Sequence, residues 1–423
     1  MKLKPMRPGV KVMRLLRLPT KLTILSLVLI VPLIVISTQL VLRLNESIDV
    51  TQAEIKGSGL VQVISNVITE VQKHRGQTNM VLSGNGNARA ALEETQGRLN
   101  ASLAQVDVAL ADAGELGLAS EWKDLRQALA DLKSTERLDA ASAFLRHSEQ
   151  VHQLSTFMYT VAERTNLLFD PEAATYFLMD MAVSHTTKWG ELLGQIRGMG
   201  AGMLASGDRS EHATDRLEAL LSEAQTETRD MQYKQGFLRK YGQDDLKGDV
   251  AIQDAQAFLA LVPRLVKEHE GMTATDYFAA GTRAVEAVSA YEKRVQERLQ
   301  LLLESRVDGD RQQRTVSVLA VVVGLCLVVY LLLSFYFSFV IDFRHALEVM
   351  RETASGNLRA HVKIRGRDEL AELTGLLEQM NGNLSGMVAE VRSNSALVAH
   401  SGRSLALGNR ELADRTEQQA ANL

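Results

Sequence analysis

LVQVISNVITEV, residues 60–71, is the stretch of the chain that decides the fold. Its apolar side chains recur at intervals of three and four residues, at Leu60, Val63, Ile64, Val67, Ile68 and Val71. This spacing is typical of a helix with one buried face. No run of comparable length alternates with a period of two, and so the sequence predicts an all-α fold.

A charge interrupts this apolar stripe. Arg75 lies four residues past Val71, beside His74 in the segment QKHRG, residues 72–76. A charge that faces a bundle interior needs a partner. One interpretation is an internal ion pair, or a side chain that reaches solvent at the bundle end. The other is an arginine fork that is free to bind a small carboxylate or oxyanion.

Two uncharged apolar runs lie far apart in the sequence, one before the helical stripe and one well after it. Residues 22–42 and 315–341 contain no charged side chain, and both exceed the roughly 20 residues that a helix needs to cross a bilayer. Residues 1–21 hold seven basic side chains and no acidic one, and such segments stay in the cytoplasm. We therefore expect two transmembrane helices in a bacterial inner membrane, a periplasmic segment at 43–314, and a cytoplasmic C-terminal part at 342–423.

The composition argues against several classes of site. Cys326 is the single cysteine, so no internal disulfide or cysteine zinc site can form. The sequence contains no GxSxG, HExxH or P-loop motif, and the spacing of His147 and His152 does not suit a metal. Outside the basic N-terminus, no part of the chain favours nucleic acid. We expect no enzyme activity, no cofactor, no metal and no nucleic-acid partner.

The periplasmic segment is too long for one ordinary four-helix bundle. Turn-forming residues divide it into about seven or eight helices. Two four-helix bundles stacked along the membrane normal, sharing long helices, are the simplest packing, so we expect an elongated domain. Asp170 and Pro171 predict the start of one helix, with Asp170 as its N-cap and Pro171 as its first residue.

A row of glycines marks one predicted helix, in WGELLGQIRGMGAGML, residues 189–204. Its members are spaced four residues apart: Gly190, Gly194, Gly198 and Gly202. Each glycine costs a helix about 1 kcal/mol relative to alanine. Either a neighbouring helix approaches closely here, or the bare backbone lines a ligand cleft. Arg197 flanks the row, and we expect it to meet Arg75 across a shared site.

The C-terminal part carries a second helical pattern. Apolar side chains alternate steps of three and four at Leu370, Leu373, Leu377, Met380, Leu384, Met387 and Val391. Such a seam is typical of a coiled coil and needs a partner chain. We therefore expect a homodimer in which two helix pairs form a four-helix bundle.

The order of elements after the second span resembles the HAMP domain of transmembrane receptors, here at residues 342–393. It consists of a helix, a glycine-led connector, an Asp-Glu pair and a second helix. The resemblance implies a parallel coiled coil. It assigns the connector glycine, the two connector packing residues and the conserved acid to Gly356, Leu358, Val362 and Glu369.

The last residues, GNRELADRTEQQAANL, look like the opening of the first methylation helix of methyl-accepting chemotaxis proteins. Residues 394–423 would then begin the cytoplasmic signalling helix, with Gln418 as the methylated position. For an intact receptor the resemblance implies a chemotaxis histidine kinase, a coupling protein, a methyltransferase and a methylesterase as partners. The family's long cytoplasmic hairpin has barely begun at residue 423, so we expect a truncated product or a fragment.

The periplasmic segment also resembles known sensors. Residues 72–76 are similar to the Gln-x-Glu-Arg-Gly signature of nitrate- and nitrite-sensing bundle domains, with His74 at the glutamate position. LLFDPEAATYFLMD, residues 167–180, is similar to an element of double-bundle periplasmic sensors. Helical bimodular domains, which bind small organic acids, are similar in size. The resemblance carries an anion-binding arginine over to Arg75, and we add Arg197 on geometry.

These features predict the input half of a transmembrane chemoreceptor. It would sense a small periplasmic anion, such as nitrate, nitrite or a small carboxylate, and signal through the HAMP domain for chemotaxis. An alternative is the sensory half of a HAMP-containing receptor histidine kinase or cyclase whose output domain is missing. A third interpretation is a membrane scaffold without a signalling role.

Overall fold

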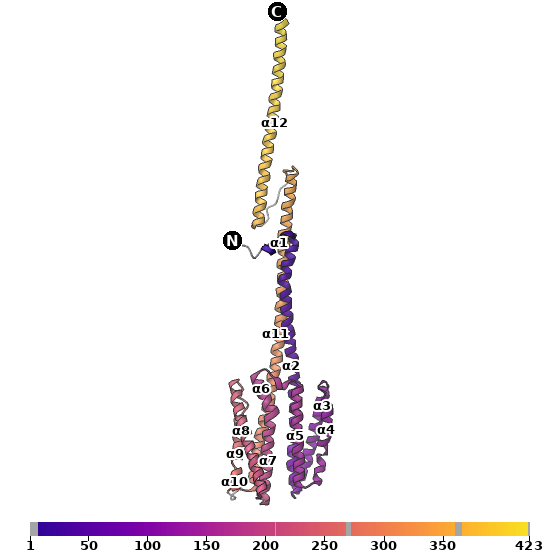
Figure 1. Ribbon diagram of the computed structural model, residues 1–423, viewed down its shortest axis with the longest axis vertical. Helices are drawn as coiled ribbons and strands as arrows, with labels where there is room; N and C mark the ends of the chain where they lie inside the picture. Colours follow the sequence, from indigo (N-terminus) through magenta and orange to yellow (C-terminus); the bar gives the residue numbers. More distant parts are fainter. Residues whose placement is uncertain (1–6, 208, 268–271, 360–365, 422–423) are drawn as a thin grey trace. The chain divides into compact units, whose positions relative to one another are not determined.

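The computed structural model describes residues 7–207, 209–267, 272–359 and 366–421. These residues are helical almost throughout and contain no strand (Figure 1), which confirms the predicted all-α fold. The chain divides into two compact units. One is Leu40–Val316, and the other combines Met1–Gln39 with Ser317–Leu423.

The unit Leu40–Val316 contains two helical bundles. The first combines the later part of α2 (Leu18–Leu82) with α3 (Arg89–Asp112), α4 (Ala119–Ala130) and α5 (Ala140–Arg164). The second combines α7 (Thr186–Ser206), α8 (Glu211–Lys240), α9 (Gly248–Leu259) and the first part of α11 (Ala274–Ala354). Between and beside them lie α6 (Ala173–Asp180), a π-helical turn (Met181–His185) and α10 (Val262–Lys267).

The two bundles lie side by side. In Figure 1, α3 and α4 occupy one flank and α8 and α9 the other, at the same level, with α5 and α7 between them. The predicted stacking of one bundle beyond the other is therefore wrong. The physical reason is the set of polar contacts between the bundles: Arg75 of α2 pairs with Glu191 of α7, and Ser65 of α2 donates to Glu292 of α11.

The apolar stripe of α2 is buried as predicted. Ile64, Val67 and Val71 are fully enclosed, and Val63 packs against the core while remaining partly exposed. The second bundle has an aromatic core of Trp189, Phe258, Tyr277 and Tyr291. The polar atoms in this core are satisfied. The Trp189 Nε1 donates to Thr228 Oγ1 at 2.9 Å and the Tyr277 Oη donates to the Ile196 carbonyl at 3.2 Å.

One of the predicted helix starts is displaced. The helix α6 begins at Ala173 with Glu172 at the N-cap position, so the prediction that Asp170 caps it and Pro171 opens it is wrong. Asp170 instead accepts hydrogen bonds from the Glu172 amide and the Thr175 hydroxyl, both at 2.8 Å. These bonds form a turn before the helix, which delays its start.

Asp170 belongs to a buried ion cluster that ties α2 to α11 (the Arg306 cluster). The Arg306 guanidinium contacts Asp170 at 2.9 Å, Glu172 at 2.9 Å and Glu54 at 3.2 Å. The Glu54 side chain is almost fully buried. Three carboxylates thus share one arginine. Burial and, to a smaller extent, the Asp170 charge raise the pKa of Glu54 to about 7, while Arg306 opposes the shift.

The other unit contains α1 (Arg7–Leu15), the first part of α2, the last part of α11 and α12 (Glu369–Ala421). Both α2 and α11 are long and apolar enough to cross a membrane. The apolar side chains of their membrane-candidate segments are largely exposed, for example Ile36 at 65% and Val323 at 59%. Such exposure suits contact with lipid.

A connector joins α11 to α12. After α11, Gly356 adopts a φ of +94°, and the Asn357 amide donates to the Glu352 carbonyl at 3.0 Å. A positive φ at the end of a helix favours glycine. Leu358 is half-buried, whereas Val362 lies outside the described residues. Glu369 is the first residue of α12.

The predicted seam of α12 is only partly covered within the chain. Leu370 and Leu377 are buried, and the Asp368 side chain accepts from the Ala371 amide at 3.0 Å at the start of the helix. Farther along, Met387 and Val391 are exposed, and so are Leu405 and Leu412 in the same helix.

A pair of glycine substitutions on α7 tests the packing of the second bundle. A Cβ added at Gly200 would lie 2.5 Å from the Tyr277 Oη, whereas one at Gly202 would have no neighbour within 4 Å. We expect Gly200→Ala to lower the free energy of unfolding by about 1–3 kcal/mol through overpacking. Gly202→Ala should raise it by up to about 1 kcal/mol. Thermal unfolding followed by circular dichroism measures both, and equal effects would contradict the packing.

Glu54 should make stability depend on pH. Because its folded-state pKa is raised from 4.5 to about 7, its contribution to stability is fully present below pH 4.5 and is lost as the pH rises through 7. We expect Glu54→Gln to remove this fall in the thermal midpoint. The exposed carboxylate variant Glu304→Gln is the control. A wild-type slope between pH 5 and 8 that survives in Glu54→Gln would contradict the assignment.

Candidate functional site

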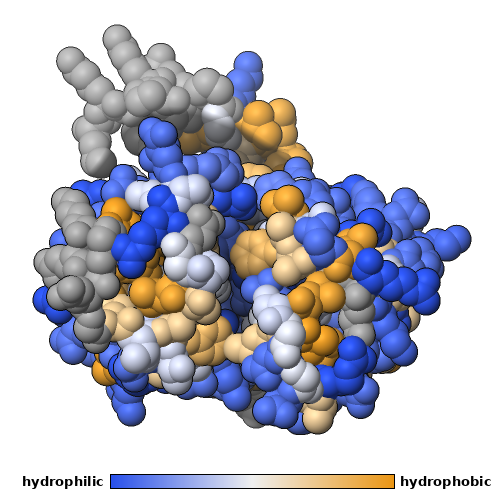
Figure 2. Space-filling view, turned by 90° about the horizontal axis from the view of Figure 1, so that it is seen from below, coloured by the Kyte–Doolittle hydropathy of each residue, from blue (hydrophilic) through white to orange (hydrophobic). Residues whose placement is uncertain are grey.

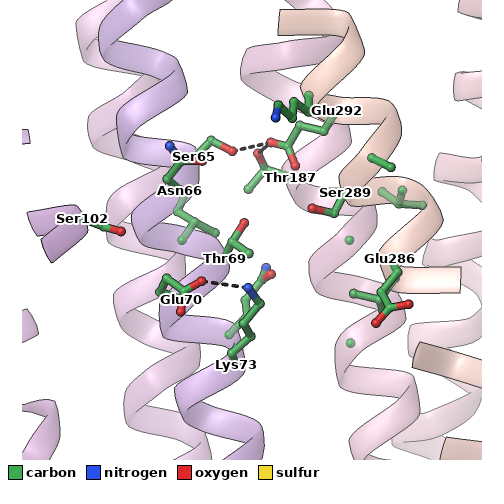
Figure 3. A pocket seen from close by; sticks show the side chains of 18 of the residues that line it. Ser65, Asn66, Thr69, Glu70, Lys73, Ser102, Thr187, Glu286, Ser289 and Glu292 are labelled. Atoms are coloured by element: carbon green, nitrogen blue, oxygen red, sulfur yellow. Dashed lines mark hydrogen bonds and ion pairs between the residues drawn. The ribbon is translucent and has the colours of Figure 1, made fainter. Parts of the chain in front are cut away.

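A pocket of about 830 Å³ lies between α2, α7 and α11 in the unit Leu40–Val316. Figure 3 shows polar side chains of α2, among them Ser65 and Thr69, on the side that faces Ser289 of α11. Seen from below, the molecule is hollowed near the middle, and both apolar (orange and tan) and polar (blue) residues border the hollow (Figure 2). Arg75 and Arg197 both line the pocket. The two arginines singled out from the sequence thus border one cavity.

Arg75 is held by a carboxylate. Its guanidinium pairs with both oxygens of Glu191 on α7, with the Nη2–Oε2 contact at 3.0 Å. Its Nη1 also donates to the Ser148 Oγ at 2.8 Å, and its Cζ lies 4.7 Å from the centre of the Phe144 ring. The Arg75 side chain is 4% exposed. Of the two interpretations of Arg75, the structure shows the internal ion pair.

Two glutamine side chains also donate hydrogen bonds to the Glu191 carboxylate. The Gln72 Nε2 donates to its Oε2 at 3.0 Å, and the Gln195 Nε2 donates to its Oε1 at 2.6 Å. Gln72 and Arg75 belong to the same signature-like segment. Residues 72–76 therefore direct two donors, the Arg75 guanidinium and the Gln72 amide, toward one planar carboxylate.

Arg197 is less completely paired. Its Nη1 donates to the Thr282 Oγ1 at 3.1 Å, and its Cζ lies 4.7 Å from the centre of the Phe278 ring. Its Nε is buried and has no hydrogen-bond partner among the described residues. Burial lowers the pKa of Arg197, and the neighbouring Arg75 charge lowers it further. An anion placed beside Arg197 would satisfy its Nε and offset this repulsion.

The glycine row contributes backbone surface rather than close helix contact. A Cβ on Gly190, Gly194 or Gly198 would have its nearest neighbour at 3.6–3.8 Å, which is ordinary packing. Gly190 and Gly194 line the pocket, as the ligand-cleft interpretation requires. The tight glycine near the site is Gly281 of α11, where a Cβ would lie 2.7 Å from the Arg197 Cγ.

The other end of the pocket holds a buried carboxyl group. The Glu292 Oε1 accepts hydrogen bonds from the Ser65 Oγ at 2.7 Å and the Thr187 Oγ1 at 2.8 Å (Figure 3). Burial raises the pKa of Glu292, and these two hydrogen bonds oppose the shift. Gln296 lies one helical turn away, and its buried Nε2 has no partner within the described ranges. The residues named at this end of the pocket are polar, and none of them is an arginine.

A histidine pair supports the arginine end. The His74 Nδ1 lies 2.8 Å from the His147 Nε2, and the His147 Nδ1 lies 2.7 Å from the Ala143 carbonyl oxygen. Burial lowers the pKa of His147 to about 4, although its bond to Ala143 acts in the opposite direction. A neutral His147 that donates to the carbonyl accepts from His74. The pair joins α2 to α5 next to Arg75.

The structure groups only some of the predicted site residues. Arg75 and Arg197 share the pocket, whereas Gly356, Leu358, Glu369 and Gln418 belong to the other unit, where Gln418 is exposed on α12. Among the described residues no cluster of three or more His, Cys, Asp and Glu side chains is arranged to hold a metal. Sequence reasoning missed Glu191 and Glu292. Glu292 could have been noticed because it lies within the apolar spacing of Val288 and Val295.

Comparisons with known proteins agree with this architecture. The structure of the NasR transcription antiterminator has the same fold, with a TM-score of 0.50 at 19% identity, covering 81% of this chain and 92% of that one. Methyl-accepting chemotaxis protein IV of Escherichia coli (strain K12) is 37% identical over 70 residues. That match covers 16% of this chain and 13% of the receptor.

The profile of the nitrate and nitrite sensing family matches residues 66–300. This range includes Arg75, Arg197 and all of the residues that line the pocket except Gln62 and Ser65. The predicted resemblance to chemotaxis receptors with a nitrate- and nitrite-sensing type of domain is confirmed. The chain belongs to the nitrate and nitrite sensing family.

Proposed function

We propose that this chain is the input half of a transmembrane chemoreceptor that binds a small anion, such as nitrate, nitrite or a small carboxylate, between Arg75 and Arg197. The observation that carries the proposal is the state of the two guanidinium groups. The Arg75 guanidinium is paired with the Glu191 carboxylate, and the buried Nε of Arg197 has no hydrogen-bond partner among the described residues. Both border the same pocket.

Glu191 indicates how the anion is recognised. A carboxylate and a nitrate are both planar and trigonal, and both offer two oxygens to an arginine fork. Gln72, Arg75 and Gln195 donate to the Glu191 carboxylate, and the Ser148 hydroxyl oxygen accepts from Arg75. In the proposed cycle the ligand replaces Glu191 on Arg75 and pairs with Arg197. Glu191 then turns toward solvent, because its own carboxylate is already partly exposed.

This exchange would couple binding to a shift between helices. The Arg75–Glu191 pair joins α2 to α7, and the Arg306 cluster joins α2 to α11. A ligand that binds one packing of these helices more tightly than the other shifts their populations. Since α2 and α11 each continue into an apolar segment, we propose that they carry this shift across the bilayer. Residues 22–42 and 315–341 would be the spans, with 43–314 in the periplasm and both termini in the cytoplasm.

On the cytoplasmic side we propose a HAMP domain at residues 342–393 and a signalling helix from 394. The positive φ of Gly356 and the exposed apolar side chains of α12 support this proposal. A second copy of the chain would cover these side chains, giving a homodimer. The partial match to a chemotaxis receptor supports chemotaxis as the output, with Gln418 as a methylation site and the chemotaxis kinase, its coupling protein and the methylation enzymes as partners. The receptor would act without catalysis.

Arginine variants test the anion site. We expect Arg75→Lys and Arg197→Ala each to weaken nitrate or nitrite binding by about 10- to 100-fold, because each loses a charge-assisted hydrogen bond of about 1.5–3 kcal/mol. Isothermal titration of the detergent-solubilised chain, with chloride at matched ionic strength, measures this loss. Arg298→Ala, which removes a pair with Asp245 away from the pocket, is the control. Unchanged affinity in both pocket variants would refute the site.

Glu191 should compete with the ligand. We expect Glu191→Gln to bind the anion at least about tenfold more tightly, since Arg75 then has no tethered carboxylate. The unliganded variant should also unfold at a lower temperature, because a buried charge loses its partner. Anion titration and thermal shift measure both effects. Glu304→Gln, which changes an exposed carboxylate of α11 outside the pocket lining, is the control. Weaker binding in Glu191→Gln would show that Glu191 supports the site rather than competing with the ligand.

A further inference from the structure

The short helix α1 (Arg7–Leu15) lies outside the unit that contains the pocket, and the proposed anion site gives it no role. Its residues fall on two different sides. At 3.6 residues per turn, Lys11 and Arg14 share one side of the helix, whereas Val12 and Leu15 share another. Basic and apolar residues are thus segregated, which is typical of helices that lie in a membrane interface.

Both sides of α1 are exposed. Leu15 is 82% exposed and Val12 is 57% exposed, and the Lys11 and Arg14 side chains are exposed as well. Residues 1–21 contain seven basic residues and no acidic one, so no carboxylate of this segment can pair with these cations. The helix therefore presents cations and apolar side chains together on a surface that suits an anionic partner with an apolar layer beneath it.

A break in the backbone separates α1 from α2. Pro19 has no amide to donate to the Leu15 carbonyl, and α1 ends at Leu15 while α2 begins at Leu18. The uncharged run begins at Leu22, only four residues into α2, which is about 6 Å of helix. The headgroup layer on each side of a bilayer is about 5–8 Å thick. The start of α2, and with it α1, therefore lies at about the depth of the lipid headgroups.

We propose that α1 is a lipid-binding helix that lies on the cytoplasmic leaflet. Val12 and Leu15 enter the boundary between headgroups and acyl chains, and Lys11 and Arg14 contact the phosphate groups of anionic phospholipids. The inference rests on the proposed topology, in which residues 1–21 are cytoplasmic. It goes beyond the anion-sensing role, because it assigns a partner to a segment that the sensing pocket does not involve.

Charge and polarity together favour a lipid surface over a second copy of the chain. Two copies of α1 would bring like charges close together, which is unfavourable. An anionic leaflet instead offers phosphate groups to the cations and acyl chains to the apolar side chains along one plane. Docking there would fix the depth of the cytoplasmic end of α2, the helix that carries Arg75.

Two spin labels on the full chain test this placement. Val10 and Val12 are exposed residues of the same type, and positions two residues apart on a helix point about 160° apart. Each is changed to cysteine in a Cys326→Ala background, labelled, and reconstituted into nanodiscs of phosphatidylcholine with or without phosphatidylglycerol. Electron paramagnetic resonance then measures the access of oxygen and of an uncharged, water-soluble nickel chelate to each label.

We expect opposite results at the two positions when phosphatidylglycerol is present. The label from Val12→Cys should be accessible to oxygen and shielded from the nickel chelate, whereas the label from Val10→Cys should stay accessible to the chelate. In pure phosphatidylcholine the chelate should reach both labels. The single native cysteine is removed in every sample, so each spectrum reports on one site.

Charge variants test the lipid specificity. Each basic side chain near an anionic surface favours binding by about fivefold. We therefore expect the double variant Lys11→Gln/Arg14→Gln to lower the ratio of docked to undocked α1 by about 25-fold, so that the chelate reaches the label at position 12. Arg43→Gln removes an exposed charge outside α1, and this control should retain the wild-type shielding.

The remaining outcomes overturn the inference. Equal access of the chelate to both labels in both lipids would show that α1 does not dock. Equal shielding at position 12 with and without phosphatidylglycerol would show apolar insertion without binding of anionic lipid. Shielding from oxygen and chelate together would indicate a protein contact, such as a second copy. Loss of shielding in Arg43→Gln would assign the effect to net charge rather than to α1.

The topology is tested separately from lipid binding. A membrane-impermeant thiol reagent that labels Val10→Cys from the periplasmic side of intact cells would refute the proposed topology and the cytoplasmic placement of α1. Nanodiscs expose both faces of the bilayer, so their result does not depend on the orientation of the chain. Failure of the topology and failure of lipid binding are therefore distinguishable, and neither experiment involves the anion pocket.

Discussion

The buried pairing of Arg75 with Glu191 determines how the helices around the pocket pack. Removing a guanidinium from water costs several kcal/mol unless a charged partner and hydrogen bonds compensate. Here the partner comes from α7, and Ser148 of α5 adds a further acceptor. One side chain of α2 therefore fixes the distance between three helices. Any ligand that competes for this arginine must also change how those helices contact one another.

A second arginine repeats this arrangement in another part of the same unit. Arg306 of α11 gathers Glu54, Asp170 and Glu172. At the pocket Arg75 pairs with one carboxylate, that of Glu191, whereas the Arg306 cluster has more carboxylates than its cation can neutralise. Burial, reinforced by the charges of Asp170 and Glu172, raises the pKa of Glu54 to about 7. The contact between α2 and α11 is thus held by a network whose charge changes by one proton within the physiological range.

Local patterns in the sequence were enough to predict the helices and one part of the site. The stripe from Leu60 to Val71 specified a buried helix face, and Arg75 stood out because it interrupted that stripe. Arg197 was placed near it only through the glycine row. The partner of Arg75 could not be predicted, because Glu191 lies more than one hundred residues away and any acid on a facing helix would satisfy the same rule. Bundle arrangement was also out of reach, since helix lengths permit stacking and lateral packing equally until the contacts are known.

In the proposed cycle, the Glu191 carboxylate also limits how tightly the chain can bind the anion. Glu191 is present at a high effective concentration beside Arg75, so a free anion must outcompete it with contacts that Glu191 lacks. Nitrate can gain only the Nε of Arg197 in this competition. In the proposed cycle Glu191 thus keeps the unliganded packing of α2 against α7 populated when the anion is absent.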